Sequence, residues 1–181
     1  MKLFHYVQKG SNVLERGILS FAKNPQADLS YYTRRSGAET HDGVVRWMES
    51  CFEGRSRGIR VFSEPIRWTE KSLSLQKFVE QTDRFALDVT AMERDGLIEA
   101  AYCSPAGIVN DPSKIEYGTD EVLVKLDSVR DIDFSPVDWK KCDDALGLRF
   151  YVVPYYLLIV KGGVVLPEYL SLEVGQTELC C

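Results

Sequence analysis

Histidine is scarce in this sequence, and the cysteines follow no metal-binding or disulfide pattern. Among 181 residues there are two histidines, His5 and His41, and five cysteines without a Cys-x-x-Cys pair. A zinc site built from histidine and cysteine would need ligands scattered along the chain, so we expect no metal. The odd cysteine count and the chain length argue against a disulfide scaffold. We therefore expect free thiols in a reducing compartment, the cytoplasm.

Motifs for phosphate loops and hydrolase nucleophiles are also absent, as are long basic or apolar runs. The sequence contains no G-x-x-x-x-G-K, G-x-G-x-x-G or G-x-S-x-G. The net charge is −5, and the basic segments "YYTRRSG" and "GRSRGIR" are short. This argues against a broad nucleic-acid-binding surface. No stretch approaches the roughly 20 apolar residues that span a bilayer, and the N-terminal segment lacks the apolar core of a signal peptide.

What the sequence does contain predicts one α+β domain. The chain is 45% hydrophobic, enough for a substantial core. Strands and helices mix early, and strands dominate the last third, which favours a curved mixed or antiparallel sheet with short helices. The predicted strands are 3–7, 58–64, 84–89, 97–103, 120–126, 149–153 and 155–160, and the predicted helices begin near 12, 40, 74 and 90.

Polar residues and glycines mark where the predicted helices begin and the chain turns. Asn12 is the expected N-cap of the first helix, Thr40 of the second, and Thr90 opens a capping box with Glu93. Residues 24–39 are predicted to be mostly loop. The sequence Lys-Gly-Gly at 161–163 predicts a tight turn into a strand that begins at residue 164.

Several polar and aromatic residues stand in unusual settings. They are His5 in the first strand, Tyr31 and Tyr32 in a predicted loop, Ser63 and Glu64 at a strand end before Pro65, and Glu121 at the start of an apolar strand. Each has a plain structural explanation, such as a hydrogen-bonded histidine or a solvated strand end. Cys51 could pair with a histidine as a nucleophile, but its place beside an apolar helix stripe favours a buried structural thiol.

Taken together, these segments resemble ADP-ribosyltransferase-like domains. The segment "LFHYVQKGSNVLERGIL" is similar to the opening of such domains, and "RVFSEPI" is similar to a strand of bacterial stress and phage-defence proteins. The segments "RFALDVTAMERDGLIEAAYC" and "YLLIVKGGVVLPEYL" resemble the following strand–helix–strand and a closing hairpin. The resemblance implies one domain over residues 1–172, with 173–181 as a tail. The S-x-S strand and E-x-E loop of better-known members are missing.

The resemblance implies that the protein uses NAD as a co-substrate. Glu64 or Glu121 would be the carboxylate that stabilises positive charge on the ribose as nicotinamide leaves. His5 would hydrogen-bond a ribose hydroxyl, and Tyr31 or Tyr32 would stack on nicotinamide. Further NAD-binding candidates are Arg34, Arg35 and Arg60 for the pyrophosphate, with Ser63 beside Glu64.

The acceptor of the ADP-ribosyl group stays open at this point. It could be a protein side chain, a nucleic acid, a small molecule or water, and water would make the protein an NAD glycohydrolase. The resemblance implies a toxin, an effector or a defence protein. The alternative is a catalytically inactive binding module, such as an immunity protein, an antitoxin or an adaptor, because a fold alone does not establish activity.

Overall fold

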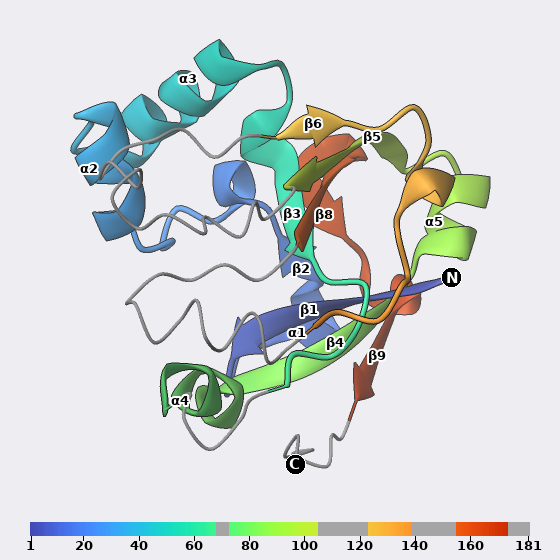
Figure 1. Cartoon of the computed structure of the whole chain (residues 1–181). Helices are drawn as coiled ribbons and strands as arrows, with labels where there is room; N and C mark the ends of the chain where they lie inside the picture. Colours follow the sequence, from blue (N-terminus) through green and yellow to red (C-terminus); the bar gives the residue numbers. More distant parts are fainter. Residues whose placement is uncertain (68–72, 105–122, 139–154, 174–181) are drawn as a thin grey trace.

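The computed structural model describes residues 1–67, 73–104, 123–138 and 155–173, and it confirms an α+β domain with antiparallel sheets and short helices (Figure 1). The α-helices are α1 Val13–Arg16, α2 Ser30–Ser36, α3 His41–Cys51, α4 Leu73–Gln81 and α5 Val89–Arg94. The strands are β1 Lys2–Gln8, β2 Ile18–Leu19, β3 Gly58–Val61, β4 Thr82–Asp88, β5 Ile98–Ser104, β6 Val124–Lys125, β7 Tyr155–Val160, β8 Val164–Val165 and β9 Leu170–Glu173. Short 3-10 turns are η1 Phe21–Lys23, η2 Arg55–Arg57, η4 Val129–Asp131, η5 Lys161–Gly163 and η6 Pro167–Tyr169. The predicted strand 149–153 lies outside the described residues.

The described strands form three sheets, and every pairing between them is antiparallel. The strand orders are β1-β4-β9, β2-β8 and β3-β7-β5-β6. The two larger sheets share one core, to which Leu3 and Leu87 contribute from the first sheet and Ile59 and Leu158 from the second. All four side chains are at most 2% exposed. The core therefore lies between the two larger sheets.

The prediction that residues 3–7 and 58–64 belong to one sheet is wrong. β1 pairs along its whole length with β4, whereas β3 pairs with β7 in the other large sheet. The two segments meet at a single bridge between Phe4 and Phe62. β1 and β3 run in different directions, and it is the chain just after β3 that passes β1 (Figure 1), where the Phe4–Phe62 bridge forms. The regular strand also ends at Val61, before Ser63 and Glu64.

The predicted closing hairpin is also wrong. The chain does turn at 161–163, where Gly162 and Gly163 both have φ of 72°. However, β7 pairs with β3 on one side and β5 on the other, so it has no free edge for the strand that follows. β8 instead pairs with β2.

Two local predictions about helices are corrected by hydrogen bonds that the sequence pattern did not indicate. The segment 24–39 contains α2, whose first residue Ser30 donates its backbone N–H to the Asp28 side chain at 2.8 Å. The N-cap of α5 is Asp88, which accepts from the Ala91 N–H at 3.0 Å, rather than Thr90. The Thr40 cap is confirmed.

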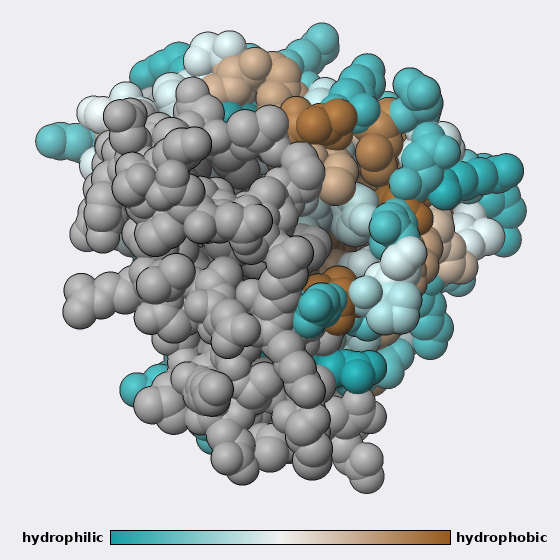
Figure 2. Space-filling view, in the orientation of Figure 1, coloured by the Kyte–Doolittle hydropathy of each residue, from teal (hydrophilic) through white to brown (hydrophobic). Residues whose placement is uncertain are grey.

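None of the helices in the described part of the chain is long and apolar enough to cross a membrane. On the face shown in Figure 2, the described surface is largely hydrophilic, with hydrophobic side chains gathered over β6. Val124 of β6 is 50% exposed.

Candidate functional site

The candidate site lies where β1 meets the segment that follows β3, a region we call the sheet junction (residues 4–6 and 60–66). Phe4 and Phe62 exchange both backbone hydrogen bonds, each 2.8 Å long. Side chains add two more connections. The Nδ1 of His5 lies 2.6 Å from the carbonyl oxygen of Arg60, and the Ile66 N–H donates to the Tyr6 hydroxyl at 2.7 Å. These contacts place His5 beside the end of β3.

The contact with Arg60 determines the protonation of the His5 ring. Because a carbonyl oxygen only accepts hydrogen bonds, Nδ1 must carry the proton, and in the neutral ring Nε2 is then an acceptor. Burial lowers the pKa of His5, opposed by the hydrogen bond to the Arg60 carbonyl and assisted by the nearby Arg60 charge. Within the described part of the chain, Nε2 has no hydrogen-bond partner. His5 can therefore accept a hydrogen bond from a hydroxyl donor.

The lowered pKa of His5 predicts a loss of stability in acid. Below the ordinary histidine pKa of about 6.5, the unfolded chain takes up a proton that the folded ring resists until lower pH. The free energy of unfolding should therefore fall as the pH drops from about 6.5 towards the folded pKa, by at most about 1.4 kcal/mol per pH unit. Urea unfolding at several pH values, for the parent and His5→Asn, measures this difference.

Asparagine is a matched control in this experiment, because its side-chain N–H can replace Nδ1–H as the donor to Arg60 but does not titrate. The acid-dependent difference between the two proteins should be confined to the range below about pH 6.5. Parallel stability curves for the parent and His5→Asn would contradict the assignment.

Glu64 makes a structural contact at the same junction. Its Oε1 accepts the backbone N–H of Val137 at 2.9 Å. Val137 packs in a small apolar cluster around buried Ile66, together with Tyr6, Phe62, Phe78 and Val79. The carboxylate therefore holds the 132–138 segment against the sheet junction.

Arg60 and Ser63 lie on the same segment as Glu64. The Arg60 side chain is exposed, and its guanidinium lies 4.4 Å from the centre of the Tyr155 ring. Ser63 is partly buried. The residues singled out from the sequence that lie at the sheet junction are therefore His5 on β1 and Arg60, Ser63 and Glu64 on the segment that meets it.

Tyr32 belongs to a different group of side chains. Its ring packs against Phe21 at 4.9 Å and against Trp47 at 6.5 Å, between centroids. His41 stacks on Phe21 and its Nε2 lies 2.8 Å from the Phe21 carbonyl oxygen. This group joins α2 and α3 to η1 rather than lining the sheet junction. Tyr31, Arg34 and Arg35 lie in α2, and their side chains are not described; Glu121 lies outside the described residues.

Cys51 is not buried, contrary to the expectation from its helix stripe. The thiol is exposed at the end of α3 and donates to the Trp47 carbonyl oxygen at 3.4 Å. Its place in the last turn of the helix puts it beyond the buried Val44 and Met48. Cys51 and Cys103 are free thiols, and the other three cysteines lie outside the described residues. In the described ranges, no group of three His, Cys, Asp or Glu side chains could hold a metal ion.

Tyr6 and Arg84 are polar residues of the junction that the sequence analysis did not single out. They face each other across β1 and β4, with the Arg84 charge close enough to the Tyr6 hydroxyl to affect its pKa. Arg84 also lies over the Phe4 ring, 5.7 Å from its centre. Burial raises the pKa of Tyr6, although the hydrogen bond from the Ile66 N–H and the nearby Arg84 charge oppose this. Only the register between β1 and β4 reveals the pair, since 78 residues separate Tyr6 from Arg84 (84 − 6).

Comparisons of the chain with protein-family models, with curated proteins and with solved structures find no match. The candidate site must therefore be interpreted from its own geometry.

Proposed function

We propose that the protein binds NAD at the sheet junction and cleaves it, as an ADP-ribosyltransferase or an NAD glycohydrolase. The observation that carries this proposal is the neutral His5 ring, whose Nδ1–H is held by the Arg60 carbonyl and whose Nε2 remains an acceptor. A ribose hydroxyl is a suitable donor for that nitrogen. The sequence resemblance to ADP-ribosyltransferase-like domains supports the same role for His5.

In the proposed reaction, the bond between ribose C1′ and the nicotinamide nitrogen breaks. Its electron pair leaves with nicotinamide, and an oxygen or nitrogen of the acceptor bonds to C1′ and loses its proton. Positive charge develops on the ribose, and a carboxylate nearby stabilises it. Glu64 is the described candidate for this carboxylate, since it follows the strand whose Arg60 carbonyl orients His5. Arg60, whose guanidinium lies over the Tyr155 ring, is the candidate for the pyrophosphate contact.

The proposal predicts different effects for substitutions at His5 and Glu64. His5→Asn should keep a donor to Arg60 but remove the Nε2 acceptor, and it should weaken NAD binding by about tenfold, as expected for one hydrogen bond. Glu64→Gln should lower turnover by about a hundredfold or more with little change in NAD affinity, because the charge acts in the transition state. Calorimetric titration measures the affinity, and nicotinamide release measures the turnover.

Glu121→Gln is the matched control, because it makes the same change at the other candidate carboxylate. If Glu121 rather than Glu64 is essential, the loss of turnover will follow Glu121→Gln. If NAD binds to neither the parent nor the variants at millimolar concentration, the proposal is wrong. Thermal unfolding of each variant separates lost function from lost folding.

A second candidate function, a binding module without catalysis, is favoured by one observation. Glu64 already accepts the Val137 N–H, which gives the carboxylate a structural role that needs no substrate. In that case Glu64→Gln would reduce stability by at most about 1 kcal/mol, because the glutamine oxygen can still accept the Val137 N–H in a weaker hydrogen bond, and NAD would not be consumed. The same experiments distinguish the two functions.

A further inference from the structure

A second ligand site is indicated at the end of β1 and β4, on the opposite side of the sheet from His5. Side chains alternate between the two faces of a strand. Gln8 therefore shares a face with Tyr6, whereas His5 shares the other face with Leu3. Gln8 lies directly opposite Thr82 in the pairing of β1 with β4. This argument does not depend on the proposed reaction with NAD.

A cavity of about 540 Å³ lies at this end of the sheet. It is lined by Gln8, Lys9, Phe78, Glu80, Gln81 and Thr82. Its volume falls in the range of about 300–1,000 Å³ that is usual for small-molecule sites. The backbone is well anchored there, because the Lys9 N–H donates to the Gln81 carbonyl at 3.0 Å and the Thr82 hydroxyl donates to the Phe78 carbonyl at 2.8 Å.

The polar side chains around the cavity divide into engaged and unengaged groups. The Glu80 carboxylate accepts from the Gln76 amide at 2.8 Å, and the Thr82 hydroxyl donates to the Phe78 carbonyl. By contrast, the side chains of Gln8, Lys9 and Gln81 are exposed and have no hydrogen bond or ion pair in the described ranges. Two carboxamides and one ammonium group are therefore available to a ligand.

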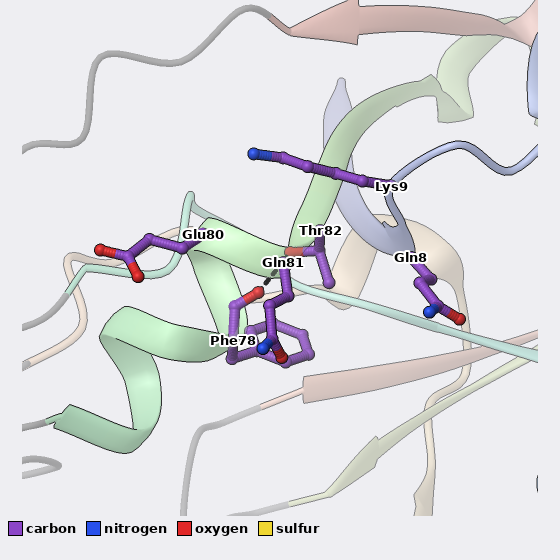
Figure 3. A pocket seen from close by; sticks show the side chains of 6 residues that line it. All are labelled: Gln8, Lys9, Phe78, Glu80, Gln81 and Thr82. Atoms are coloured by element: carbon purple, nitrogen blue, oxygen red, sulfur yellow. Dashed lines mark hydrogen bonds between the residues drawn. The ribbon is translucent and has the colours of Figure 1, made fainter.

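The arrangement of these groups indicates the kind of ligand. In Figure 3 the side chains of Gln8 and Gln81 point in a similar direction, and the Lys9 side chain extends another way; Phe78 and Gln81 both line the cavity. Phe78 is held by Tyr6, at 5.4 Å between ring centroids. An aromatic ring can stack on a base, a glutamine amide can pair with the adenine edge, and a lysine can bind phosphate.

We propose that this cavity binds an adenine mononucleotide. The base lies against Phe78 and hydrogen-bonds the carboxamides of Gln8 and Gln81, and the phosphate reaches Lys9. A free nucleotide and the adenylate half of a dinucleotide share this chemistry, so the experiment must separate the two.

Calorimetric titration of the whole chain with AMP tests the proposal. We expect Gln81→Ala and Lys9→Glu each to weaken AMP binding by about tenfold, and Lys9→Glu to leave adenosine binding nearly unchanged because adenosine lacks the phosphate. Both positions are exposed, so folding should be preserved. Lys77→Glu is the matched control: it makes the same charge change on exposed α4 without touching the cavity, and it should leave the AMP affinity unchanged.

Titrations with other ligands identify the source of the nucleotide. Ribose 5-phosphate should bind at least tenfold more weakly than AMP, because it lacks the base. His5→Asn should leave AMP binding intact, which separates this cavity from the sheet junction. If NAD binds this cavity more tightly than AMP does, the ligand is the adenylate half of the dinucleotide rather than a free nucleotide. The proposal is overturned if AMP fails to bind at millimolar concentration, or if Gln81→Ala and Lys9→Glu bind AMP as tightly as the parent.

Discussion

Gly17→Ala is expected to destabilise the fold by about 3 kcal/mol or more, from backbone strain and overlap together. Gly17 has φ of 77° and ψ of −176°, a region that only glycine adopts readily. A Cβ at this position would also overlap the carbonyl oxygen of Val165. That carbonyl cannot easily move away, because Val165 is paired with Ile18 in the β2–β8 sheet. Urea unfolding should show a lower midpoint with an unchanged slope.

Gly96→Ala provides the matched control for this prediction. Gly96 also has a positive φ, of 66°, but a Cβ there would meet no atom within 4 Å. Its substitution should therefore cost about 1–2 kcal/mol, the backbone penalty alone. Equal losses for the two variants would mean that the close approach of Gly17 to β8 contributes nothing to stability.

Leu158→Ala is expected to cost about 3–5 kcal/mol, at the upper end of the range for leucine in a core. Leu158 is fully buried in β7, between β3 and β5, where it pairs with Ile59 and Ala101. Strands on both sides restrain the backbone, so the cavity that the substitution leaves can collapse only partly. The same unfolding experiment measures this loss.

Leu172→Ala is the control for Leu158→Ala, because it removes the same atoms from the edge strand β9, where the side chain is 45% exposed. The loss there should stay below about 1.5 kcal/mol, since the side chain gives up much less buried area. If Leu158→Ala and Leu172→Ala lower the free energy of unfolding by similar amounts, the main core does not lie between the two larger sheets.

The sequence pattern predicts many of the helices and strands, but it does not predict which strands pair with each other. Alternating apolar residues identified β1 and β4, because the side chains on one face of each strand reach the core, and a continuous apolar run identified β7, which is buried on both faces. Which strand a given strand pairs with cannot be predicted in this way, because it depends on which strand edges of the sheet are still unpaired. β7 has neighbours on both sides, so the glycine turn after it could not make the hairpin that its residues favour.

The candidate site was predicted in part, for a similar reason. His5, Arg60, Ser63 and Glu64 were singled out, and they do lie on two crossing segments. The hydrogen bond from Val137 to Glu64 could not be foreseen, because it joins positions 73 residues apart through a loop without a periodic pattern. Tyr32 was grouped with His5 because of the resemblance to ADP-ribosyltransferase-like domains, whereas its neighbours are determined by the helix α2 that the sequence pattern did not indicate.

The strand order has a consequence for the synthesis of this protein on the ribosome. Each of the three sheets includes a strand from residues 155–173: β7, β8 or β9. β3 and β5 flank β7, and β2 has β8 as its partner, so these strands emerge from the ribosome before their neighbour exists. Such long-range pairing makes folding slow and leaves strand edges uncovered meanwhile. The nascent chain should therefore depend on chaperone protection until residues 155–173 have emerged from the ribosome.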